Sequence, residues 1–159
     1  MNLAVQITKD EFWRIVDQVE RELLYGPKLK FVRGASWRKE QVQESPGLYA
    51  LFDKETLLYI GETGNLRERM SDVFRTVNHT FRGKLAKNRF SPVKVGLKFD
   101  EHTEALLDAF FDNDLHVALV KANFGRTEIE TALVTRHQAQ LLNSVKKRKL
   151  GEYLDDGDS

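Results

Sequence analysis

The chain has 159 residues, of which 41% are hydrophobic and 31% are charged, and it contains no cysteine. This length and composition predict a single folded domain with its own apolar core. The lack of cysteine excludes disulfides, thiolate metal sites and cysteine nucleophiles. No apolar run approaches the roughly 18 residues of a membrane-spanning helix. The first residues also lack the apolar core of a secretory signal, so we expect a cytoplasmic protein.

Charge is distributed unevenly along the chain, although the net charge is only +1. Residues 61–98 carry nine Lys or Arg and three acids, whereas residues 99–116 carry six acids and no Lys or Arg. A basic segment of this kind suits contact with phosphates, although an ordinary solvated surface has the same composition. The candidate contacts that it offers are His79, Arg82, Lys84, Lys87 and Arg89.

The first predicted element is a helix that begins after Thr8. Thr8 and Glu11 form the pattern of a capping box, and Gly26 is a stop signal. The apolar residues of this helix recur on one face: Phe12, Val16, Val19 and Leu23. The region from there to Ser45 shows no sustained alternation, so we predict no regular element in it.

Residues 47–52 and 57–61 are short apolar stretches separated by four polar residues, a pattern that predicts a β-hairpin. Each stretch holds a tyrosine two residues from a glycine, as Gly47-Leu48-Tyr49 and Tyr59-Ile60-Gly61. The two phenols share a face of the sheet only if an odd number of residues turns the corner. A simple four-residue loop would therefore place them on opposite faces.

A second helix is predicted after the hairpin, because Asn65 and Glu68 form another capping pattern. With Leu66 and Met70 facing the core at helical spacing, Arg69 lies at the border of the buried face. An arginine beside two phenols suits a phosphate, whose oxygens match the planar guanidinium fork, although an arginine that covers the core has the same spacing.

The rest of the chain mixes strands and helices. Residues 92–99 alternate as a third strand, residues 115–120 form a fourth, and an acidic helix lies between them. A last helix is predicted from near Thr127 to near Asn143, with Ile129, Leu133 and Val134 inward. Strands and helices that are mixed in this way, with an antiparallel pair at the start, predict an α+β fold.

Four separated motifs occur in an order that resembles the GIY-YIG nuclease superfamily. They are Gly47-Leu48-Tyr49, Tyr59-Ile60-Gly61, the segment from Glu62 to Arg69, and the segment from Ile129 to Asn143. The resemblance covers residues 46–143, and residues 78–82 and the acidic segment resemble small stand-alone members. It implies a short antiparallel sheet flanked by helices, here with an N-terminal helix and an extra strand and helix inserted.

The resemblance also implies roles for individual residues in a metal-dependent cleavage of DNA phosphodiesters that leaves 5′-phosphate ends. Tyr49 would be the general base that activates water, and Tyr59 would hydrogen-bond to the nucleophile or the phosphate. Arg69 would neutralise charge on the phosphate, and Glu130 would be the protein ligand of one Mg²⁺ or Mn²⁺. Glu130 has a structural alternative, since it stands three residues after Thr127 and also fits a capping box.

Two positions depart from the family pattern. Many members carry a histidine four residues after the arginine, where this chain has Val73, and many have a basic residue after the second motif, where it has Glu62.

We divide the chain into an N-terminal helical extension at 1–46, a nuclease domain at 47–143 and a charged tail at 144–159.

The expected partner is DNA, with a homodimer or a partner protein as a source of specificity. Lys146 to Lys149 either hold a nucleic-acid backbone or form a solvated tail. The competing interpretations are a catalytically silent nucleic-acid-binding module and a subunit that acts only with a partner.

Overall fold

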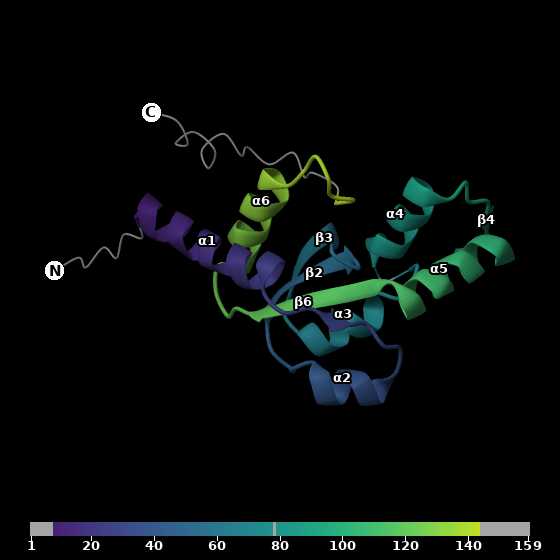
Figure 1. Cartoon of the computed structure of the whole chain (residues 1–159), viewed down its shortest axis with the longest axis horizontal. Helices are drawn as coiled ribbons and strands as arrows, with labels where there is room; N and C mark the ends of the chain where they lie inside the picture. Colours follow the sequence, from purple (N-terminus) through teal and green to yellow (C-terminus); the bar gives the residue numbers. More distant parts are fainter. Residues whose placement is uncertain (1–7, 78, 144–159) are drawn as a thin grey trace.

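The computed structural model describes residues 8–77 and 79–143, so the basic run at 146–149 lies outside the described residues. The elements follow one another along the chain (Figure 1) as α1 (Lys9–Tyr25), β1 (Leu29–Lys30), α2 (Ala35–Gln41), β2 (Gly47–Asp53), β3 (Thr56–Thr63), α3 (Leu66–Asp72), α4 (Thr80–Arg89), β4 (Lys94–Val95), β5 (Lys98–Phe99), α5 (Glu101–Asn113), β6 (Leu115–Lys121) and α6 (Arg126–Arg136). This order of strands and helices confirms the predicted α+β class.

A four-stranded antiparallel sheet with the strand order β1-β6-β2-β3 forms the centre of the molecule. Alternate residues of β2 enter two separate apolar clusters, because successive side chains of a strand point to opposite faces. Leu48 and Phe52 pack with α1 and α6, whereas Tyr49 and Leu51 pack with α3, α4 and α5. The sheet therefore has helices on both faces, and α6 lies beside the edge strand β3.

Several predicted elements are confirmed with their end signals. Thr8 is the N-cap of α1 and makes both hydrogen bonds of the capping box. The Thr8 side chain accepts from the Glu11 N–H, and the Glu11 carboxylate accepts from the Thr8 N–H. Asn65 is the N-cap of α3, and its side-chain oxygen accepts a hydrogen bond from the Glu68 N–H. These caps satisfy N–H groups that the first helical turn leaves without an intrahelical partner.

The region before Ser45 contains two elements that the sequence does not predict. Leu29 and Lys30 pair with Val117 and His116 of β6 and so form the outer strand of the sheet. Residues 35–41 form α2, whose described residues are all at least partly exposed. Both elements are too short for a hydrophobic period to show in the sequence.

The prediction of one continuous third strand at residues 92–99 is wrong, and an unpredicted helix precedes this segment. Residues 80–89 form α4, which the sequence hides because basic residues interrupt its apolar pattern. Residues 92–99 form a two-stranded hairpin, β4 and β5, and not one strand. Gly96 adopts a positive φ of 66°, which glycine tolerates, and this turns the chain back on itself.

The last helix also differs from the expectation, because α6 ends at Arg136 and Asn143 lies beyond it. Gly125 begins α6 in the left-handed region, and no side chain caps it. Glu130 therefore lies in the second turn and is not part of a capping box, so that structural alternative is wrong.

None of the helices in residues 8–77 and 79–143 has the length and apolar character of a membrane-spanning helix.

Candidate active site

The two tyrosines of the hairpin share a face of the sheet because of a β-bulge. The turn itself places Asp53 opposite Thr56, an even connection that would separate the phenols. The register then shifts between Leu51 and Phe52, so that Leu51 pairs with Tyr59 and Tyr49 pairs with Gly61. The additional residue, Leu58, joins the same apolar cluster as Tyr49, and the two tyrosine rings lie stacked 6.2 Å apart. Counting residues between the two tyrosines could not predict this bulge, and the count alone would have placed the phenols on opposite faces.

Tyr49 lies on the central strand β2 and is 2% exposed. Its ring passes directly over Gly61, where an added Cβ would lie 2.3 Å from both Cζ and the hydroxyl oxygen. Glycine is therefore required opposite Tyr49 by a close approach and not by backbone conformation. Gly47 in the other strand has a different reason, because a Cβ there would lie 2.3 Å from the Val120 carbonyl oxygen.

His79 contacts the Tyr49 hydroxyl directly. Its Nε2 lies 2.7 Å from the phenol oxygen, and its Nδ1 accepts a hydrogen bond from the Phe81 N–H at 3.0 Å. Because Nδ1 accepts, the proton of the neutral ring is on Nε2, which donates to Tyr49. Burial, with repulsion from Arg69 and Lys84, lowers the pKa of His79 to about 4, so the ring is neutral near pH 7.

His79 thus enters the site from the start of α4, at a place that the sequence did not predict. We expected it among the nucleic-acid contacts, whereas the structure buries it beside Tyr49 at 5% exposure. Its side chain also caps α4, since Phe81 is the second residue of that helix. The signal that sequence reasoning missed is this N-cap position, because α4 itself was not predicted.

Arg69 and Glu130 act electrostatically on both phenols. Burial raises the pKa of Tyr49 and of Tyr59, the negative charge of Glu130 raises each further, and the positive charge of Arg69 lowers each. Arg69 belongs to α3 on the tyrosine face, whereas Glu130 belongs to α6 beside the edge strand β3. Arg69 and Glu130, from two different helices, are thus close enough to act electrostatically on the two phenols of the hairpin.

The Arg69 side chain has a buried donor without an internal acceptor. Its Nε is covered from solvent and has no hydrogen-bond partner within residues 8–77 and 79–143. A buried N–H of a charged group costs free energy unless an acceptor reaches it. A phosphate oxygen is such an acceptor, and a guanidinium binds it with charge-assisted hydrogen bonds.

Asn143 holds the edge of the strand that carries Tyr59. Its side-chain oxygen accepts from the Ile60 N–H at 3.0 Å, and its amide nitrogen donates to the Ile60 carbonyl at 2.6 Å. The neighbouring Leu142 N–H donates to the Leu58 carbonyl at 2.8 Å. The asparagine at the end of the fourth motif therefore fixes the outer edge of β3 next to Tyr59.

Glu62, where many members of the superfamily have a basic residue, forms an ion pair. Its carboxylate accepts from Arg126 Nε at 3.1 Å, so a cation from the start of α6 stands beside this acidic position. The charge of Glu62 is close enough to Tyr49 to contribute to its raised pKa. Arg126 is a site residue that the sequence analysis did not single out.

The remaining basic candidates divide between the interior and the surface. Arg82 is 3% exposed and bridges Glu104 and Asp108 of α5 at 2.5 and 2.8 Å, so it is not available on the surface. Arg89 pairs with Asp53 at 2.7 Å, whereas Lys87 is exposed on α4. Lys84 is partly buried near His79, and burial lowers its pKa.

The chemistry of Glu130 fits a hard divalent cation. A carboxylate is the type of ligand that Mg²⁺ and Mn²⁺ accept, and Mg²⁺ keeps much of its hydration when one carboxylate binds it. The negative charge of Glu130 also raises the pKa of both tyrosines, an effect that a bound cation would oppose. Within the described part of the chain, no group of three or more His, Asp or Glu is placed to hold a metal ion.

Comparison with known proteins assigns the chain to a family. A family model described as the GIY-YIG catalytic domain matches residues 38–155. The UvrABC system protein C of Pseudomonas savastanoi pv. phaseolicola is 38% identical over 63 residues, which cover 39% of this chain and 10% of that protein. The protein of the same name from Pseudomonas syringae pv. tomato is 36% identical over the same shares.

The chain spans about a tenth of the length of these relatives. No solved structure matches it significantly. The family match covers most of the chain, and it includes the hairpin, Arg69 and Glu130. The chain therefore belongs to the GIY-YIG family of nuclease catalytic domains.

Proposed function

We propose that this protein is a divalent-metal-dependent endonuclease that hydrolyses phosphodiester bonds of DNA in the cytoplasm. One observation carries the proposal. The charges of Arg69 and Glu130, from α3 and α6, both act on the hydroxyls of Tyr49 and Tyr59. A phosphate group between these residues would meet a cation, two hydroxyls and a metal-binding carboxylate at once.

In this mechanism Tyr49 is the general base that takes a proton from the attacking water. A phenol with an ordinary pKa near 10 is a weak base at neutral pH, and burial raises its pKa further. The hydrogen bond that His79 Nε2 donates to the phenol oxygen and the charge of Arg69 both stabilise the phenolate. These two neighbours therefore favour the charged form that the reaction needs.

The other residues bind and orient the phosphate. Arg69, which is only partly buried, presents its guanidinium to a phosphate oxygen and offsets the charge that grows there in the transition state. Tyr59, whose hydroxyl is 3.5 Å from Thr80 Oγ1, hydrogen-bonds to the phosphate or to the nucleophile. Glu130 would hold Mg²⁺ or Mn²⁺, which supplies Lewis-acid polarisation of the phosphate when bound.

Cleavage of supercoiled plasmid tests this function. We expect the wild-type protein to nick or linearise the plasmid with Mg²⁺ or Mn²⁺ and not with EDTA. Glu130→Gln and Tyr49→Phe should each lower the rate at least 100-fold (about 3 kcal/mol) because they remove the ligand and the base. Glu40→Gln, a change at an exposed acid of α2, serves as the matched control and should keep the wild-type rate.

The outcomes of this assay separate the alternatives. A wild-type protein that binds the plasmid and never cuts it would favour a silent or partner-dependent module. Cutting that Glu130→Gln retains would show that the metal ligand is another residue. A single centre nicks one strand, whereas a homodimer or a complex with a partner protein would also give linear product, so the product form reports the assembly.

A further inference from the structure

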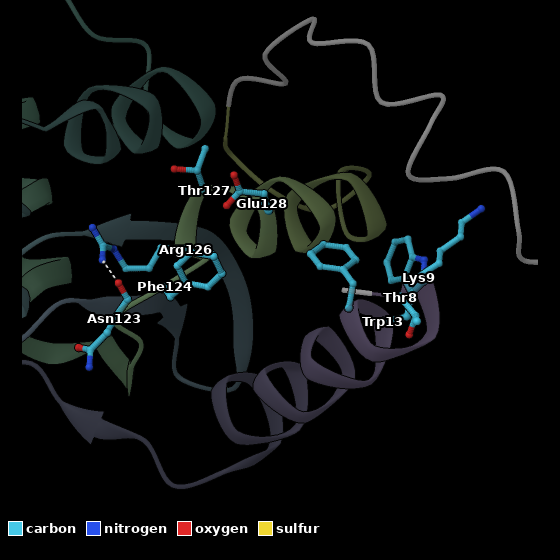
Figure 2. Close-up of a pocket in the computed structure, with 10 residues that line it drawn as sticks. Thr8, Lys9, Trp13, Asn123, Phe124, Arg126, Thr127 and Glu128 are labelled. Carbon is cyan, nitrogen blue, oxygen red and sulfur yellow. Dashed lines mark hydrogen bonds between the residues drawn. The ribbon is translucent and has the colours of Figure 1, made fainter. Parts of the chain in front are cut away.

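An aromatic groove opens between the first turns of α1 and α6. It has a volume of about 770 Å³, within the roughly 300–1,000 Å³ of typical ligand sites. Lys9 and Trp13 line it from α1, and Phe124 and Arg126 line it from the other side (Figure 2). Of these residues only Arg126 also takes part in the tyrosine centre, through its ion pair with Glu62, so the groove adjoins that centre.

The groove presents flat aromatic surfaces. Phe124, in the loop between β6 and α6, is 80% exposed, although a large apolar side chain is ordinarily at least partly buried. Phe12 and Trp13 stand edge to face on the opposite side with their ring centroids 5.3 Å apart. An exposed ring that faces a fixed aromatic pair is a suitable platform for stacking another flat ring.

The polar lining favours an anionic ligand. Two cations, Lys9 and Arg126, line the groove together with one acid, Glu128, and Arg126 also pairs with Glu62 next to the groove. The start of α6, from Gly125 to Glu128, lines the groove, and no side chain caps this helix. Backbone N–H groups at a helix start carry partial positive charge and favour a phosphate. Aromatic surface and cations together match a nucleotide.

The groove is continuous with the candidate active site. Arg126 lines the groove and at the same time binds Glu62, whose charge acts on the Tyr49 hydroxyl. Glu130 is four residues after Arg126 on α6, just over one helical turn and about 6 Å along the axis. A strand whose phosphate lies at Glu130 therefore has its neighbouring nucleotides within reach of the groove.

We propose that this groove binds unpaired nucleotides next to the scissile phosphate, with bases on Phe124 and Trp13 and a phosphate at Arg126. The proposal rests on the proposed nuclease function and narrows its substrate to DNA that is single-stranded or open near the cut. Paired bases in a continuous duplex are stacked on each other and do not offer a free face to Phe124. A polypeptide segment is the competing occupant.

Tryptophan fluorescence gives a direct test, because the chain has two tryptophans on different sides of the sheet. Trp37 packs on Phe31 in the cluster of α3 to α5, and Trp13 packs in the cluster of α1 and α6. Trp37→Phe thus leaves Trp13 as the only reporter. The titration uses this variant with Glu130→Gln in EDTA, so that no cleavage occurs, and adds short oligo(dT) or a duplex of equal length.

We expect oligo(dT) to quench Trp13 and to bind more tightly than the duplex. Phe124→Ala should raise the Kd for oligo(dT) about 5- to 100-fold, the range for loss of one stacked base, and change duplex binding less than twofold. Tyr25→Ala removes an aromatic ring of similar exposure, 74%, from the other end of α1 and should change neither affinity. It is the matched control for non-specific contact.

Each unfavourable result has a distinct meaning. Absence of quenching, or equal effects of Phe124→Ala on both ligands, would overturn the groove proposal and leave a polypeptide as its occupant. Equal weakening by Tyr25→Ala would also overturn it. If plasmid cleavage is intact in these cases, the nuclease function stands. If oligo(dT) binds as expected and the wild-type protein never cuts, the groove stands and the nuclease proposal fails.

Discussion

Neighbouring residues shift the pKa of the Tyr49 hydroxyl in opposite directions. Burial and the negative charge of Glu130 favour the neutral phenol, whereas Arg69 and the hydrogen bond from His79 favour the phenolate. Removal of water strengthens each of these interactions, because little solvent screens them. The reactivity of this phenol therefore depends on the exact position of neighbours that come from β3, α3, α4 and α6.

His79 makes folding stability depend on pH. Its pKa is about 4 in the folded protein, lowered by burial and by Arg69 and Lys84 against a smaller opposite effect of Asp72, compared with 6.5 for an unperturbed histidine. Below about pH 6.5 the unfolded chain binds a proton that the folded chain excludes. Stability is therefore full above that pH and falls by about 3 kcal/mol as the pH approaches 4.

Urea unfolding at a series of pH values measures this effect. His79→Gln should flatten the pH dependence between pH 6.5 and about 4 relative to the wild type. His102→Gln, a change at an exposed histidine of α5, is the control and should follow the wild-type curve. Identical curves for wild type and His79→Gln would contradict the buried position of the ring.

Sequence reasoning named several candidate site residues because their motifs are local. Tyr49, Tyr59 and Arg69 are close in sequence, and helical geometry alone placed Arg69 at the border of the core. Sequence reasoning did not predict the contact of His79 with Tyr49 or that of Arg126 with Glu62, since these contacts join residues 30 and 64 positions apart. Spacing along a chain carries no information on such pairs until the fold brings them together.

At the scale of elements, the β2–β3 hairpin shows how backbone geometry supports chemistry. The bulge at Leu58 sets the face of Tyr59, and the lack of a side chain at Gly61 makes room for the ring of Tyr49. Strong periodic patterns made α1, β2, β3 and β6 predictable. The bulge was not predictable, because it depends on register, and α4 was not, because its apolar residues are too few for a clear period.

Gly61→Ala tests the close approach within the hairpin. The new Cβ would lie 2.3 Å from the Tyr49 ring, which is buried and has little space to move. We expect a loss of stability of about 1–3 kcal/mol and a loss of cleavage of at least tenfold as the hydroxyl moves. Gly64→Ala is the matched control, because its Cβ meets no atom within 4 Å.

Urea unfolding and plasmid cleavage, measured on the same two variants, separate packing from position. A Gly61→Ala protein with wild-type stability and wild-type rate would refute the close approach. A similar defect in Gly64→Ala would point instead to a general need for glycine flexibility after β3.

At the scale of the whole molecule, a buried ion cluster joins the helices on the tyrosine face. Arg82 of α4 bridges Glu104 and Asp108 of α5, and its guanidinium also lies 4.7 Å from the centre of the Phe74 ring. Arg33 covers the same ring at 4.7 Å from a more exposed position and pairs with Asp112. These contacts position α4, which supplies His79 to the candidate active site.

Substitution of these two arginines separates buried from exposed charge. Arg82→Met leaves two partly exposed acids without their buried partner and should lower the free energy of unfolding by about 3 kcal/mol, the low end for a broken buried pair. Arg33→Met removes a surface ion pair and an exposed ring contact, so it should cost about 1 kcal/mol or less. Urea unfolding checks both values, and equal losses would contradict the structural role of the Arg82 cluster.

The outer edge of β3 has a consequence for how copies of this protein can meet. An open edge strand offers unpaired N–H and C=O groups to a strand of another molecule, a common route to domain swapping and aggregation. Here Leu142 and Asn143 occupy the Leu58 and Ile60 groups of that edge. The opposite edge is β1, which has only two residues. Sheet extension between molecules is thus blocked on one side and short on the other, and we expect two copies to associate through helical surfaces.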